Sequence, residues 1–231
     1  FTHVAETLPN VIGLTPSIDL TRVKPDTYGS GATCPAIQPI LDSLKHLNED
    51  DKSVIYQSLD LNNIILGGHS AGGTMALQNG QFFEQVKAIF SYAGHTMAST
   101  MLGFTPGTVL NIGSKPTLLI RGDRDGVIAA SRVRYGADEQ SADPVEKTFD
   151  EAIRASGRED AYDILLQGAN HFSVAHPLDE TTGRFFLDQE AGRANEDIRE
   201  DVANLVKSFI NKHIRGQNLD IQSKHAIIRR K

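Results

Sequence analysis

The stretch that decides the fold reads IILGGHSAGGTMAL and covers residues 64–77. It opens with an apolar run from Ile64 to Leu66, crosses a glycine-rich segment, and continues with helical character from Thr74 to Leu77. This order predicts a strand, a sharp turn and a helix. Outward from it, apolar runs alternate with amphipathic stretches along the chain. The alternation predicts an α/β fold: a mostly parallel, doubly wound sheet with helices on both faces.

The same patterns place the other elements of this single domain, which we expect to cover residues 1–214. We expect the C-terminal tail, residues 215–231, to be basic, frayed and solvated. The predicted strands are Val11–Thr15, 64–66, Val86–Tyr92, Pro116–Arg121 and Tyr162–Leu166, and the predicted helices are Pro35–Leu47, the segment after Ser70, Pro144–Ala155 and Asn195–His213.

Composition narrows the classes of partner. The 231 residues carry a formal net charge of −6, which argues against a nucleic acid held through phosphate contacts. The single cysteine, Cys34, excludes an internal disulfide framework and a multi-cysteine metal site. No apolar run approaches the length of a membrane-spanning helix, and no signal peptide is visible. The sequence starts at Phe1, so we expect an upstream piece to be missing; cytoplasmic and secreted locations stay open, as does the oligomeric state.

The turn contains Gly68-x-Ser70-x-Gly72, the spacing typical of a nucleophile elbow. Such a turn strains the serine backbone and lifts its Oγ clear of the sheet. Side chains two residues before or after the serine are expected to collide with neighbouring backbone, so we expect both glycines to be sterically required. The helix that follows directs its first N–H groups at the same spot, and the backbone N–H of Ala71 is the predicted oxyanion donor. His69 is expected to pack rather than to act as the base.

A serine hydroxyl needs a neighbouring base, and the base needs a partner that orients it. His171 is the favoured base because its turn, residues 168–172, directly follows a predicted strand. The alternates are His95 and His176. Asp125, just past another strand end, is favoured over Asp123 as the acid; the alternative is that either carboxylate caps the turn or the next helix.

The segment between Gly94 and Lys115 is expected to lie over the carboxyl ends of the strands, where ligand sites form in α/β proteins. Its apolar side chains either line an acyl pocket or pack beneath the loop. Because the segment is too short for a large inserted cap, we expect an open pocket that accepts varied small esters. The candidate substrate contacts are His69, His95, Met97, Phe104 and Phe172.

Three motifs in chain order, Gly68–Gly72, Gly122–Asp125 and Gly168–Phe172, resemble the α/β-hydrolase superfamily, and the resemblance extends from Pro9 to about His213. It implies a serine hydrolase, most often a carboxylic ester hydrolase, that acts on a small-molecule ester without metal or organic cofactor. The general appearance is similar to the dienelactone-hydrolase-like and small esterase or lipase branch. A serine nucleophile departs from the dienelactone hydrolases themselves. The implied triad is Ser70, Asp125 and His171.

The N-terminal part departs from the family pattern. Only the predicted strand Val11–Thr15 precedes the first helix, and no His-Gly loop is present to give a second oxyanion donor. That donor is expected from residues 15–17 or from a missing N-terminal portion. Two alternatives remain: a hydrolase of amides, thioesters or lactones, and a non-catalytic hydrolase-like binding protein. A phosphate-binding loop is disfavoured, because the glycine-rich turn has no P-loop lysine and no dinucleotide fingerprint.

Overall fold

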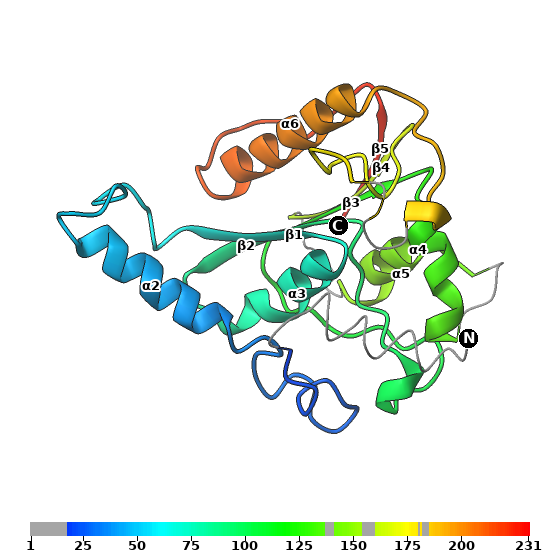
Figure 1. Ribbon diagram of the computed structural model, residues 1–231, viewed down its shortest axis with the longest axis horizontal. Coiled ribbons are helices and arrows are strands. Elements are labelled where there is room, and N and C mark those ends of the chain that lie inside the picture. Colours follow the sequence, from blue (N-terminus) through cyan, green and yellow to red (C-terminus); the bar gives the residue numbers. More distant parts are fainter. Residues whose placement is uncertain (1–17, 137–140, 154–159, 180, 182–184) are drawn as a thin grey trace.

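The structure is a computed structural model that describes residues 18–136, 141–153, 160–179, 181 and 185–231. Its strands form one five-stranded sheet in the order β1-β2-β3-β4-β5 (Figure 1). The first four strands pair in parallel, and β5 runs antiparallel to β4. The mostly parallel α/β architecture is therefore confirmed. The strands are β1 (Ile64–His69), β2 (Val86–Tyr92), β3 (Thr117–Gly122), β4 (Ala161–Leu166) and β5 (Ala226–Arg230).

In the connections between strands, α-helices follow β1, β3 and β4. The helix α3 packs against β1 and β2, α5 against β3 and β4, and α6 against β2 and β3. The start of α5 has its own signal, because the Asp143 side chain accepts hydrogen bonds from the N–H groups of Val145 and Glu146. The α-helices are α2 (Ile37–Glu49), α3 (Ala71–Asn79), α4 (Gly126–Ser131), α5 (Pro144–Glu151) and α6 (Asn195–His213), and the 3-10 helices are η1 (Gly80–Phe82), η2 (Thr100–Leu102), η3 (Arg132–Tyr135) and η4 (Phe185–Leu187).

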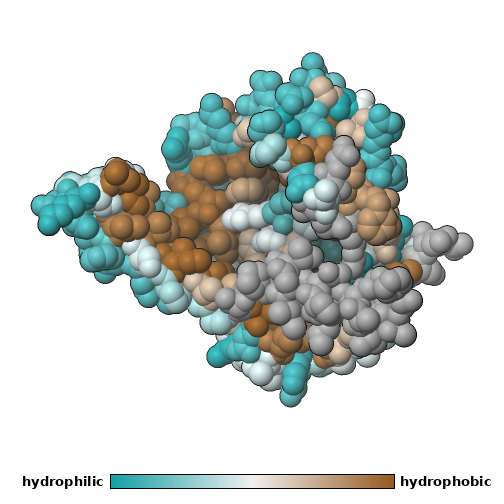
Figure 2. All heavy atoms as spheres, viewed as in Figure 1, coloured by the Kyte–Doolittle hydropathy of each residue, from teal (hydrophilic) through white to brown (hydrophobic). Residues whose placement is uncertain are grey.

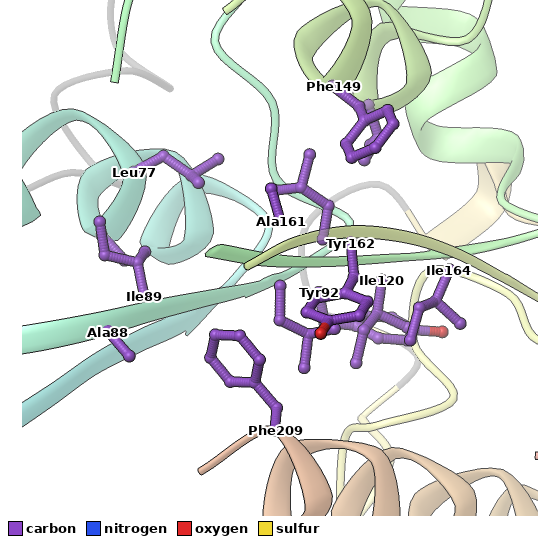
Figure 3. Packing of buried hydrophobic residues seen from close by; sticks show 14 of the residues in the cluster. Leu77, Ala88, Ile89, Tyr92, Ile120, Phe149, Ala161, Tyr162, Ile164 and Phe209 are labelled. Carbon is purple, nitrogen blue, oxygen red and sulfur yellow. The ribbon is translucent and has the colours of Figure 1, made fainter. Parts of the chain in front are cut away.

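The main hydrophobic core lies between these helices and the central strands. Ile89, Ile120 and Ile164, one from each of β2, β3 and β4, are fully buried. Figure 3 shows Phe209 pointing from α6 toward the strands, near Tyr92. Burying a side chain of this size stabilises the fold by roughly 1.5–3 kcal/mol. The core thus holds β2, β3 and β4 in register and fixes where their carboxyl ends lie.

The prediction of a frayed C-terminal tail is wrong from Ala226 onward, because those residues form β5. The pairing also satisfies a buried charge. Asp163 in β4 is 1% exposed, and its carboxylate accepts hydrogen bonds from Arg121 Nε at 3.0 Å and from Arg229 Nε at 2.8 Å. Arg229 is therefore a partner of the sheet, whereas Arg215, Lys224 and Arg230 are exposed.

The bounds of the other predicted elements agree with the structure to different degrees. The strand Val86–Tyr92 and the helix Asn195–His213 have the predicted bounds, whereas the first strand continues beyond residue 66 to His69. The helix expected at Pro144–Ala155 ends at Glu151. The predicted strand Val11–Thr15 and the oxyanion donor expected from residues 15–17 lie outside the described residues. Among the described helices, none is both long and apolar enough to cross a membrane.

Candidate active site

The glycine-rich segment forms a sharp turn between a strand and a helix. β1 ends at His69 and α3 begins at Ala71, so Ser70 alone makes the connection. Its backbone has φ 54° and ψ −121°, a strained conformation for a residue with a side chain. The Ser70 N–H donates to the carbonyl oxygen of Tyr92 at 2.8 Å, which ties the turn to the end of β2.

The steric role of the glycines differs from the expectation. A Cβ on Gly68 would lie 2.3 Å from the carbonyl carbon of Gly72, so glycine is required at 68 as predicted. At Gly72 a Cβ would meet nothing within 4 Å, so the predicted collision there is wrong. The second crowded glycine is Gly73, where a Cβ would lie 2.3 Å from Ser91 Oγ and 3.1 Å from the carbonyl oxygen of Gly68. Close packing of α3 on β2, rather than the turn itself, explains this glycine.

Asp125 and His171 form a buried hydrogen-bonded pair. Nδ1 of His171 lies 2.9 Å from Oδ2 of Asp125, and the two side chains are 3% and 4% exposed. An ionised carboxylate only accepts hydrogen bonds, so Nδ1 carries the proton and Nε2 is left to accept one. Of the three candidate bases, His171 is the one that contacts a carboxylate in this way within the described part of the chain.

The geometry separates the two candidate acids. Asp123 uses its Oδ1 to accept from the N–H of Gly168 at 2.7 Å, which joins the loops after β3 and β4. Asp125 also caps α4, because its Oδ1 accepts from the N–H of Ile128 at 2.8 Å. The same carboxylate therefore does both: Oδ1 of Asp125 caps α4, and Oδ2 contacts His171.

His69 links the serine turn to this pair. Its ring centroid lies 4.7 Å from that of His171 and 5.8 Å from that of Tyr92. Burial lowers the pKa of His69 to about 4, and its buried Nε2 has no hydrogen-bond partner among the described residues. Ser70 is the residue that follows His69 in the chain. Within the described residues, however, no hydrogen bond joins Ser70 Oγ to His171.

The other candidate substrate contacts lie in different surroundings. His95 is buried, which lowers its pKa to about 4, and its Nδ1 accepts from the N–H of Met97. Phe172 packs against His171 with ring centroids 5.0 Å apart. Phe104 belongs to a separate buried cluster with Val23, Ala98 and Leu110. His176 is exposed. A substrate role for His69, His95, Met97, Phe104 or Phe172 stays a prediction.

Several residues that hold the His171 loop were not predicted from the sequence. The Tyr92 hydroxyl donates to the carbonyl oxygen of Asn170 at 2.6 Å, and Asn170 Nδ2 donates to the carbonyl oxygen of Gln189 at 2.6 Å. Asp188 accepts from the N–H groups of Gly126 and Phe172. The position of Tyr92 at the end of a predicted strand could have indicated a residue near the site. Asp188 had no such signal, since it lies in a stretch without periodicity.

A groove of about 580 Å³ lies apart from these residues. Its walls come from α6 together with Phe90 and Val174. Figure 2 shows apolar side chains gathered in a hollow of the surface between α2 and α6. Because none of the candidate catalytic residues lines this groove, its size says nothing about the chemistry at His171.

In the described part of the chain no group of three or more histidine, cysteine or acidic side chains is arranged to hold a metal ion. No protein-family model and no curated protein matches the chain.

Proposed function

We propose that the protein is a serine hydrolase that cleaves carboxylic esters, with Ser70 as nucleophile, His171 as base and Asp125 as the acid that orients His171. The observation that carries the proposal is the buried hydrogen bond from His171 Nδ1 to Asp125, with the His171 ring packed against His69, the residue before the strained Ser70. A histidine held in this tautomer presents Nε2 as a general base. We further propose the α/β-hydrolase fold, doubly wound with helices on both faces of the sheet.

The proposed reaction is acyl transfer to water in two steps. Ser70 Oγ attacks the ester carbonyl carbon while His171 Nε2 takes its proton, and Asp125 stabilises the resulting imidazolium. The bond to the alkoxy oxygen then breaks, and His171 returns the proton to the departing alcohol. Water attacks the acyl-enzyme in the same way, and the acid leaves as serine recovers its proton. No step calls for a metal ion or an organic cofactor.

The proposed oxyanion donor is the N–H of Ala71, the first residue of α3. This position supports the assignment because the first N–H groups of a helix have no partner within the helix and lie at its positive end. Loss of one oxyanion donor costs roughly 10²- to 10³-fold in turnover. The second donor is not assigned to any described residue.

The alternative is a non-catalytic hydrolase-like binding protein. It is favoured by the unassigned second donor and by the lack, in the described residues, of a hydrogen bond between Ser70 Oγ and His171. Catalytic hydrogen bonds are often long in structures without substrate, so this second observation does not outweigh the Asp125–His171 pair. Amide, thioester or lactone hydrolysis uses the same three residues and is distinguished by substrate assays alone.

The test is covalent labelling with a fluorophosphonate, followed by mass spectrometry and by hydrolysis of p-nitrophenyl acetate. We expect the wild type to be labelled at Ser70, S70A to be unlabelled, and H171A to react at least about 10³-fold more slowly because the serine loses its base. S43A and H46A remove exposed residues of the same types from α2 and serve as matched controls. Full activity in S70A contradicts the proposal, and no labelling of the folded wild type favours the binding protein.

A further inference from the structure

Asp188 joins two loops that are distant in the sequence. It lies just after η4, and its Oδ1 accepts from the N–H of Gly126 at 3.0 Å while its Oδ2 accepts from the N–H of Phe172 at 3.2 Å. Gly126 is the residue after Asp125, and Phe172 is the residue after His171. One carboxylate therefore holds the chain immediately beyond each member of the buried pair.

Packing around Gly126 shows that this contact is built into the fold. A Cβ on Gly126 would lie 2.1 Å from the carbonyl oxygen of Leu187 and 3.0 Å from the Cα of Asp188. Only glycine at position 126 lets the 187–188 segment approach α4 so closely. The close approach is what brings the Asp188 carboxylate within reach of both N–H groups.

Two opposing effects act on the Asp188 carboxylate. Burial raises the pKa of Asp188, and the N–H groups of His171, Phe172 and Gly126 oppose that shift by stabilising the charged form. Hydrogen bonds to a charged acceptor are roughly twice as strong as neutral ones.

We propose that Asp188 is a positioning residue: its carboxylate fixes the distance between the Asp125 loop and the His171 loop, and so holds the hydrogen bond between those two side chains. The catalytic part of this inference rests on the proposed function, whereas the structural part does not. A misplacement of about 1 Å at a reacting group costs up to about 100-fold in rate, so a residue that sets this distance affects turnover without touching substrate.

The test compares wild type with D188N and E190Q. D188N keeps the size of the side chain but replaces one acceptor oxygen with a donor, so it cannot accept from both N–H groups. E190Q removes an exposed charge two residues away and controls for the change in charge. The first readout is NMR of selectively labelled histidine, which follows the His171 Hδ1 proton shared with Asp125, together with the exchange rates of the Gly126 and Phe172 amides. The second is kcat and KM for p-nitrophenyl acetate.

In D188N we expect the His171 Hδ1 signal to broaden or shift, and the Phe172 amide to exchange about 10-fold faster or more, because a hydrogen bond to a charged acceptor is lost. We expect kcat to fall by up to about 100-fold with KM nearly unchanged. E190Q should match wild type in every readout. If D188N does not fold, G126A carries the same test, because its Cβ displaces the 187–188 segment from the other side.

The outcomes separate this inference from the proposed function. An unchanged His171 signal in D188N overturns the positioning role, as does an equal change in E190Q. A changed signal in D188N, combined with a wild type that neither hydrolyses ester nor reacts with fluorophosphonate, supports the positioning role of Asp188 and refutes the proposed esterase function.

Discussion

The backbone of Ser70, with φ 54° and ψ −121°, is held by neighbours that differ in their tolerance of a side chain. We predict that G68A destabilises the protein by about 1–3 kcal/mol, because its Cβ meets the Gly72 backbone. G72A should be neutral or stabilise by up to about 1 kcal/mol, since the site is open and alanine favours the helix. Urea unfolding of both variants measures this difference. Equal destabilisation by the two substitutions would contradict the steric account.

A second prediction at the residue scale concerns the two acids after β3. D125N should keep the cap of α4, because asparagine also caps helices, yet lower kcat by roughly 10³- to 10⁴-fold through loss of the correct histidine tautomer. D123N alters only the contact with Gly168 and should lose much less. The test is to measure kcat for ester hydrolysis by the two variants, with unfolding curves to confirm that both are folded. A larger loss of kcat in D123N than in D125N would show that Asp123, and not Asp125, is the acid that orients His171.

Individual site residues could be predicted from the sequence only where they belong to a recognisable motif. Ser70 and His171 stand in recognisable turns after apolar runs. Two acids follow β3 two residues apart, and their separate partners, Gly168 and His171, are set by how the loops meet in space. Asp188 acts through the folded loops alone, so no local pattern marks it.

Among the elements, β5 depends on a buried charge cluster. Asp163 is 1% exposed between Arg121 and Arg229. We predict that D163N lowers the free energy of unfolding by about 3 kcal/mol, because it leaves arginine charges without their buried partner. D150N removes a carboxylate that is 48% exposed and also pairs with Arg229, and it should cost less than about 1 kcal/mol. Chemical denaturation compares the two. Similar small losses would show that Asp163 does not anchor the strand.

The predictability of each element follows from its burial. β2, β3 and β4 lie inside the sheet and show as nearly continuous apolar runs, which is typical of buried parallel strands. β5 is an edge strand whose residues Ala226–Arg230 include two arginines, so its sequence lacks that signal. Its place depends on Asp163, which lies more than sixty residues earlier in the chain.

For the molecule as a whole, two buried histidines predict how stability varies with pH. Burial lowers the pKa of both His69 and His95 to about 4, while the unfolded chain has a histidine pKa of about 6.5. The unfolded state therefore binds more protons between these values. The free energy of unfolding should fall as the pH drops from about 6.5 to about 4, by up to about 3 kcal/mol for each histidine. Burial raises the pKa of Asp143 and Asp188, which acts in the opposite direction at the acid end.

Urea midpoints at pH 7 and pH 5 test this prediction. H95N retains an acceptor for the Met97 N–H but does not titrate, so it should lose less stability between the two pH values than wild type. H46N, at an exposed position of α2, is the matched control and should follow wild type. Parallel behaviour of H95N and wild type would show that His95 does not contribute.

The overall architecture was the most predictable level, because the order of strands and helices along the chain determines a mostly parallel sheet. The antiparallel fifth strand was missed, since its pairing is a long-range property.

The strand β5 also changes what the basic C-terminal segment offers to a protease. By sequence alone, this segment contains potential trypsin cleavage sites after Lys224, Arg229 and Arg230. A protease binds its substrate as an extended segment with unoccupied backbone groups, whereas Arg229 and Arg230 are paired with Asp163 and Tyr162 across the ladder. Cleavage within β5 therefore requires the strand to detach first. The rate of limited trypsin digestion at these arginines then reports the local opening of the sheet edge rather than the accessibility of a loose tail.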